Sequence, residues 1–210
     1  MKNKGIKFWS VILFYGSLWG IVEASVGYVL HFLPALIAGT ILFPFASIML
    51  YKTYKDTQSK SAMLAVGIVA AAIKALNFLM PIANPFKVIN PMVSIVLEAL
   101  VVMAFVTLVA NAKWPVKISA ILVSSILWRS LYLVYMAGQM LFTGYVATQI
   151  ASVTAMMDFV LISGLLSGVM ASVFIAPFVL NIRNNRFKLA TSPLVSLGMF
   201  VLGIVLTFVL

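Results

Sequence analysis

The segment 74–98, KALNFLMPIANPFKVINPMVSIVLE, places polar and charged side chains between two strongly apolar stretches. Lys74 and Asn77 are three residues apart near the end of the first stretch, so they share one face of the helix expected there. The connection then carries three prolines: Pro81, Pro85 and Pro91. Because proline lacks an amide hydrogen and disfavours a helical residue before it, the segment predicts two helices joined by a bent connection.

The second helix is expected to begin near Pro91, at an N-terminal position that proline tolerates. Asn90, Ser94 and Glu98 then recur at four-residue steps on one face. Seven polar or charged side chains are therefore expected together at one membrane surface: Lys74, Asn77, Asn84, Lys87, Asn90, Ser94 and Glu98. We interpret this set as half of a binding site.

Composition indicates an all-α polytopic membrane helical bundle. Hydrophobic residues form 64% of the 210 positions and charged residues 9%, whereas a soluble domain has roughly 45–50% and about 25%. The net charge of +10 comes from basic residues between apolar stretches, which indicates topology rather than nucleic-acid binding. The chain has no cysteine and one histidine, so we expect no disulfide, no metal site and no cofactor.

A bilayer core needs about 20 apolar residues per helix, and the sequence supplies such stretches along its whole length. We predict one integral membrane domain over 1–210, with six core spans and a seventh at the C-terminus: 8–30, 35–51, 61–79, 91–110, 117–140, 150–177 and 192–210. The positive-inside rule then predicts a cytoplasmic N-terminus. The basic residues on the cytoplasmic side are Lys2, Lys4, Lys7, Lys52, Lys55, Lys60, Lys113, Lys117, Arg183, Arg186 and Lys188, and only Lys87 falls in an external segment.

Five ionisable residues fall inside the predicted spans, in the middle of the membrane or its outer half: Glu23, Lys74, Glu98, Arg129 and Asp158. Each costs roughly 2.5–3.5 kcal/mol near a helix centre, so these residues must pair, face the bundle interior or line water. One interpretation is that they form salt bridges between helices. Because buried ion pairs stabilise proteins weakly, their common depth favours a polar cavity that binds a ligand.

The predicted substrate site combines these charges with neighbouring aromatic and amide side chains. Aromatic rings can stack on a ligand and amides can recognise its hydrogen-bonding groups, although an aromatic belt and a hydrated loop remain the alternative for any one of them. A site with both charge signs suits a zwitterion or a charged polar heterocycle. Its members are Trp19, Glu23, Lys74, Asn77, Asn84, Asn90, Glu98, Arg129, Tyr132, Gln139 and Asp158.

A row of small residues lies on the first predicted span at Gly16, Gly20 and Ala24. Small residues at four-residue spacing let a second helix approach closely. The row therefore predicts either packing against another helix of the same chain or docking of a different membrane protein.

Together these features resemble the substrate-binding S subunits of energy-coupling-factor transporters, over roughly residues 8 to 180. The shared features are a basic, cysteine-poor chain of this size, six core helices, an outward-facing polar site and a small-residue row on the first helix. The resemblance implies capture of a vitamin-like micronutrient at the cell membrane of a prokaryote, with uptake driven by partner ATPase subunits. It also implies that Gly16, Gly20 and Ala24 dock a transmembrane T subunit. No motif assigns the substrate.

Two other functions compete with this interpretation. A proton- or cation-coupled secondary transporter, acting as a homo-oligomer, could use Glu23, Glu98 or Asp158 as the coupling group. The absence of a clear inverted repeat in the sequence opposes it. Enzyme activity is not expected, because H-E-x-x-H and G-x-S-x-G motifs are missing and no catalytic residue stands out.

Overall fold

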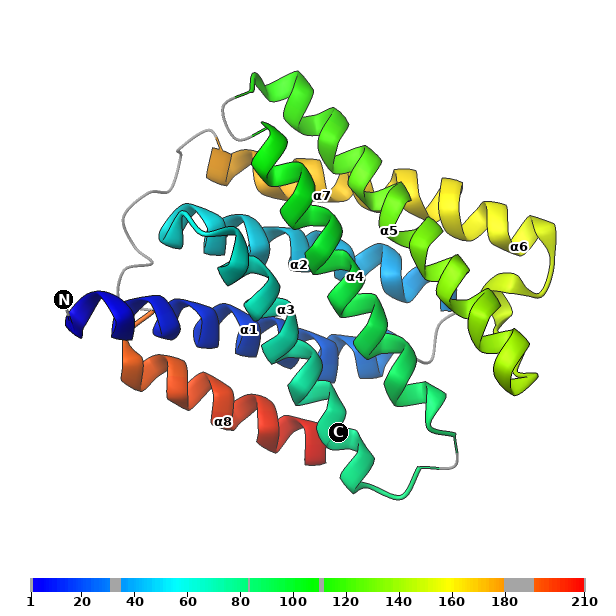
Figure 1. The fold of residues 1–210 in the computed structure, drawn as a ribbon, viewed down its shortest axis with the longest axis horizontal. Coiled ribbons are helices and arrows are strands. Elements are labelled where there is room, and N and C mark those ends of the chain that lie inside the picture. The colour runs from blue at the N-terminus through cyan, green and yellow to red at the C-terminus, as the bar shows by residue number, and fades with distance from the viewer. Residues whose placement is uncertain (1, 31–34, 83, 110–111, 180–190, 210) are drawn as a thin grey trace.

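The computed structural model describes residues 2–30, 35–82, 84–109, 112–179 and 191–209, and their regular structure is entirely helical (Figure 1). The helices are α1 (Lys2–Leu30), α2 (Ala35–Thr57), α3 (Lys60–Ala75), η1 (Leu76–Leu79), α4 (Phe86–Val109), α5 (Trp114–Thr143), η2 (Thr148–Ile150), α6 (Val153–Met157), η3 (Asp158–Ile162), α7 (Ser163–Val179) and α8 (Pro193–Val209). The predicted all-α membrane helical bundle is confirmed.

Five described segments are long and apolar enough to cross a membrane: Gly5–Gly27, Lys60–Leu79, Phe86–Val106, Trp114–Thr143 and Val153–Ala176. The last of these is one helical run, in which the π-helical turn η3 joins α6 to α7. The spans predicted at 35–51 and 192–210 fall on α2 and α8, which are not among the five. Pro193–Val209 is a shorter apolar helix.

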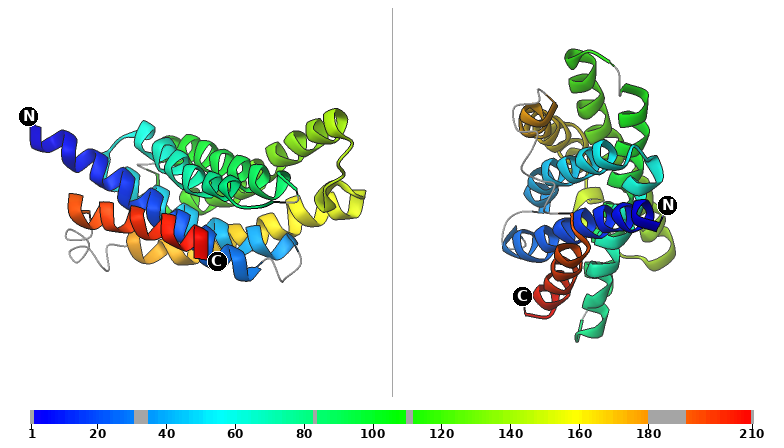
Figure 2. Two further views of the ribbon diagram at one scale, coloured as in Figure 1. Left: turned by 90° about the horizontal axis from the view of Figure 1, so that it is seen from below. Right: turned by 90° about the vertical axis from the view of Figure 1, so that its left-hand side faces the viewer.

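Six helices contact one another in a closed ring, in the order α1, α2, α7, α5, α4, α3 and back to α1. Helix α8 lies outside this ring against α1. In Figure 1, α3, α4 and α5 run diagonally across α1, α2 and α7, and Figure 2 shows the two groups as separate layers. The binding residues predicted on α1, α3, α4 and α5 therefore have a common interior to face.

Glycines on α1 let α3 approach closely. A Cβ added at Gly16 would lie 2.6 Å from Cβ of Val69, and one added at Gly20 would lie 2.7 Å from Cδ1 of Ile73. Ala24, the third member of the row, is half-buried. Helix α3 of the same chain therefore packs against the row at its two glycine positions, which is the first of the two alternatives that the row predicts.

Helix α4 begins earlier than the prolines predict, at Phe86 rather than near Pro91. The side-chain Oδ1 of Asn84 accepts a hydrogen bond from the Phe86 amide at 2.9 Å, so Asn84 caps the first turn. Pro91 consequently lies inside the helix. It has no amide hydrogen to donate to the carbonyl of Lys87, four residues earlier, which therefore lacks its usual helical donor.

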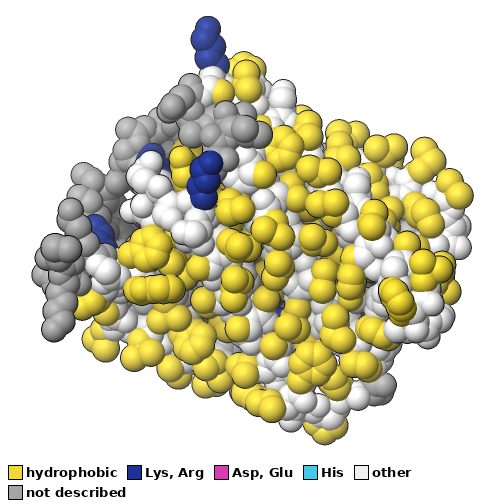
Figure 3. All heavy atoms as spheres, viewed as in Figure 1, with side chains coloured by type: hydrophobic (Ala, Val, Ile, Leu, Met, Phe, Trp, Pro, Cys, Tyr) yellow, Lys and Arg dark blue, Asp and Glu magenta, His cyan; other side chains and the backbone are white. Residues whose placement is uncertain are grey.

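Basic side chains concentrate at one end of the bundle. The face in Figure 3 is mostly hydrophobic, and its Lys and Arg side chains gather toward one edge. This end is where α1, α3 and α5 begin and α2 ends, and we call it the basic end. Its lysines include Lys7, Lys52, Lys55, Lys60, Lys113 and Lys117. Arg183, Arg186 and Lys188, which were predicted on the same side, lie outside the described residues.

Candidate functional site

A cavity of about 330 Å³ lies toward the end of the bundle opposite the basic end. We call it the outer cavity. Helices α1 to α5, the segment after α5 and the π turn contribute to its wall. It falls at the lower end of the roughly 300–1,000 Å³ typical of small-molecule sites. Five of the predicted binding residues line it: Glu23, Lys74, Asn90, Glu98 and Tyr132.

Glu98 is the most deeply buried acidic side chain of this wall, with 3% of its surface exposed. Its Oε1 accepts a hydrogen bond from the Ser94 hydroxyl at 3.0 Å, one turn earlier on α4. Its Oε2 has no hydrogen-bond partner in the described part of the chain. A buried carboxylate oxygen without a donor carries a large desolvation cost. A ligand that brings a donor or a positive charge into the outer cavity would offset it.

Glu23 and Lys74 add one charge of each sign to the same wall. The indole Nε1 of Trp19 donates to Oε1 of Glu23 at 3.2 Å, one turn away on α1. The carboxylate of Glu23 and the ammonium group of Lys74 lie close enough to interact electrostatically. Trp19 is not part of the wall; it is buried in the core, from which its indole N–H orients Glu23.

Arg129 was predicted in the site, but the structure places it behind the cavity wall. The side chain is fully buried, and its Nη1 and Nη2 donate at 3.0 Å to the carbonyls of Ser125 and Gly39. Its Cζ lies 4.5 Å from the ring centroid of Trp128, which lines the cavity. Arg129 therefore joins α5 to α2 and supports the Trp128 ring by a cation–π contact.

Aromatic rings form one side of the outer cavity. The centroids of Tyr132 and Phe159 are 6.0 Å apart, and those of Trp128 and Tyr132 are 6.1 Å apart. The hydroxyl of Tyr135 donates to Oδ1 of Asn90 at 2.9 Å and so links α5 to α4. These contacts hold a largely apolar platform in the same wall as the two carboxylates.

Besides Trp19 and Arg129, four predicted residues do not line the outer cavity: Asn77, Asn84, Gln139 and Asp158. Asn84 caps α4 instead. Asp158 begins the π turn and is half-buried, whereas the next residue, Phe159, lines the cavity. Successive helical residues point in different directions, and of this pair it is Phe159 that lines the cavity. Gln139 is buried, and neither of its side-chain amide atoms has a hydrogen-bond partner in the described ranges.

Sequence reasoning missed the contribution of α2, which places Gly39 and Leu42 in the wall. A Cβ added at Gly39 would lie 3.7 Å from the Trp128 ring and 3.8 Å from Nη2 of Arg129. This half of α2 carries no charged residue, so only the tertiary contacts could reveal it. Phe159 was also missed, because the prediction chose the preceding charged residue, Asp158, instead.

Comparisons of the chain with protein-family models, with curated proteins and with solved structures found no match. Within the described residues, no group of three or more His, Asp or Glu side chains is placed to hold a metal ion. The chemistry available at the outer cavity is therefore that of two carboxylates, lysines and an aromatic platform.

Proposed function

We propose that the protein acts in membrane transport by capturing a small polar solute with charges of both signs in the outer cavity. The observation that carries the proposal is the buried Oε2 of Glu98, which has no hydrogen-bond partner in the described residues and belongs to a side chain that lines the same wall as Glu23 and Lys74. In a structural salt bridge, a basic side chain of the protein would donate a hydrogen bond to this oxygen. In a binding site, the bound solute supplies that donor.

The proposed solute is complementary to the wall. Its cationic group would interact with the carboxylates of Glu98 and Glu23, and its anionic group with the ammonium groups of Lys74 and, at the exposed rim, Lys87. A flat or apolar portion would pack on the platform that contains Trp128. A vitamin-like micronutrient meets this description.

We propose partner ATPase subunits as the source of energy, as the resemblance to energy-coupling-factor S subunits implies. The positive-inside rule supports a cytoplasmic basic end, so the outer cavity would open outward and capture solute before uptake. The surface for a transmembrane partner subunit would lie away from Gly16 and Gly20, because α3 covers those residues.

A proton- or cation-coupled secondary transporter is the second candidate. One observation favours it: the filled groove on α1 is not open to a partner in this structure. Glu98 would then carry the coupling proton or cation, since intramembrane carboxylates serve this role in many pumps and transporters.

Native mass spectrometry of the protein, purified gently from its own host, tests the proposal. We expect a retained polar solute, together with a second membrane subunit and an ATPase pair. A bound solute on a homo-oligomer without ATPase subunits would instead support the second candidate. Protein free of any solute, and unable to bind added zwitterionic vitamins or amino acids, would refute capture in the outer cavity.

A further inference from the structure

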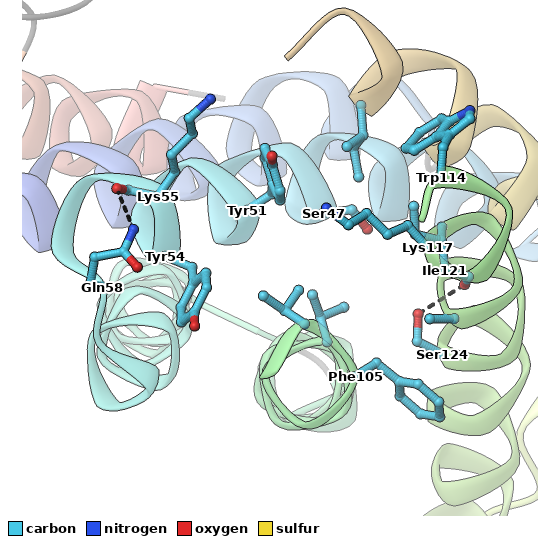
Figure 4. A pocket seen from close by; sticks show the side chains of 14 residues that line it. Ser47, Tyr51, Tyr54, Lys55, Gln58, Phe105, Trp114, Lys117, Ile121 and Ser124 are labelled. Atoms are coloured by element: carbon cyan, nitrogen blue, oxygen red, sulfur yellow. Dashed lines mark hydrogen bonds between the residues drawn. The ribbon is translucent and has the colours of Figure 1, made fainter. Parts of the chain in front are cut away.

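A second cavity, of about 420 Å³, lies at the basic end between α2, α4, α5 and α7. We call it the inner cavity, and Figure 4 shows the side chains that line it. It shares no lining residue with the outer cavity. On α4 the two walls come within one helical turn of each other, at Glu98 and Val102.

The charged side chains that line the inner cavity are both lysines, Lys55 and Lys117. In Figure 4, Lys117 extends from α5 toward α2. The hydroxyl-bearing residues Tyr51 and Tyr54 belong to the same wall, and Ser47 adds a hydroxyl that is 2% exposed and has no hydrogen-bond partner in the described residues. With donors and positive charge but no lining carboxylate, the inner cavity is suited to an anion.

The rest of the wall is apolar. Val102 and Val106 on α4 and Ile121 on α5 face the same space as the lysines. Trp114 stands at the start of α5, where an amphipathic ring suits the membrane interface. A free inorganic anion would leave this apolar surface uncovered, whereas an amphipathic anion would cover it.

We propose that the inner cavity binds an acidic phospholipid, with Lys117 and the neighbouring hydroxyls at the phosphate and the apolar wall against the chain region. Basic pockets between transmembrane helices on the cytoplasmic side bind such head groups in other membrane proteins, and the cytoplasmic leaflet is the one rich in anionic lipid. This site goes beyond the proposed transport function, because none of its residues contacts the outer cavity.

The test uses full-length protein, delipidated in detergent, and native mass spectrometry with added phosphatidylglycerol. We expect saturable retention of the lipid, and an affinity about tenfold lower for Lys117→Gln, since one charge-assisted hydrogen bond is lost. Lys117→Arg should retain the lipid. Lys113→Gln is the matched control, because Lys113 precedes α5 by one residue, is exposed and does not line the inner cavity.

Two comparison ligands, phosphatidylcholine and glycerol phosphate, distinguish an acidic phospholipid from other phosphate compounds. Weak retention of phosphatidylcholine and of glycerol phosphate would support an acidic phospholipid. Glycerol phosphate binding as tightly as phosphatidylglycerol, with the same Lys117 dependence, would overturn the lipid assignment in favour of a soluble phosphate compound. Equal retention of phosphatidylglycerol by the original protein and Lys117→Gln would overturn the site itself, provided that both unfold at the same temperature.

Discussion

Glu98 in the wall of the outer cavity and Arg129 in the packed layer behind that wall carry opposite charges that interact electrostatically. The two regions differ in the hydrogen-bond partners that these side chains find. Arg129 donates from Nη1 and Nη2 to backbone carbonyls on two helices and stacks on Trp128, and its Nε has no hydrogen-bond partner in the described residues. Glu98 accepts from Ser94 and leaves its second oxygen without a partner in the described residues. Burial of a charge therefore does not by itself mark a binding residue. What distinguishes Glu98 is that its unpaired oxygen belongs to a side chain that lines a cavity, whereas Arg129 lies outside the cavity wall.

The largest effect is expected for Arg129→Ala in the packed layer. Loss of the guanidinium leaves the carbonyl of Gly39 without this donor and opens a space behind Trp128, which should lower the free energy of unfolding by about 3–5 kcal/mol. Thermal unfolding in detergent measures this, with Arg129→Lys as an intermediate control that keeps the charge. Unchanged unfolding combined with lost solute binding would place Arg129 in contact with the ligand instead.

The next effect concerns the packing of α1 on α3. Gly20→Leu should destabilise the fold by about 1–3 kcal/mol, because even a Cβ at this position would lie 2.7 Å from Ile73. Gly5→Leu is the matched control on the same helix, since a Cβ there meets nothing within 4 Å. A Gly20→Leu protein that folds normally but fails only in ATP-driven uptake would restore the docking interpretation.

On the cavity wall, Glu98→Gln should separate binding from stability. The amide oxygen of glutamine can still accept from Ser94, so unfolding should change little, while affinity for the retained solute falls about tenfold through loss of the negative charge. Isothermal titration with the solute identified by mass spectrometry measures the change. Undiminished affinity in this variant would remove Glu98 from the proposed site.

The smallest effect is expected for Asp158→Asn. Asp158 is half-buried and lies outside the cavity wall, so solute affinity should change less than about twofold. The same titration compares it directly with Glu98→Gln, which makes it the matched carboxyl-to-amide control. A loss comparable to that of Glu98→Gln would show that the π turn presents Asp158 to the solute.

Much of the segment 74–98 was predictable because its signals are local. The four-residue spacing of Asn90, Ser94 and Glu98 puts them on one face of any helix, and the structure finds all three in the wall of the outer cavity. The structure places Asn84 outside this wall, where its side chain caps α4; such a side chain can either bind a ligand or cap a helix. That choice depends on where α4 begins, and the prolines suggested a later start.

The sequence by itself determined that this chain is a bundle of apolar helices with a basic end and with charged residues inside its apolar segments. Hydrophobic length and charge placement suffice for that, because a bilayer acts on each segment separately. The tertiary structure decided which charges face a cavity. Arg129 finds a partner in Gly39, on a helix far away in the chain, and Glu98 lines a cavity that several helices enclose. Such distances between helices are not encoded in any local pattern.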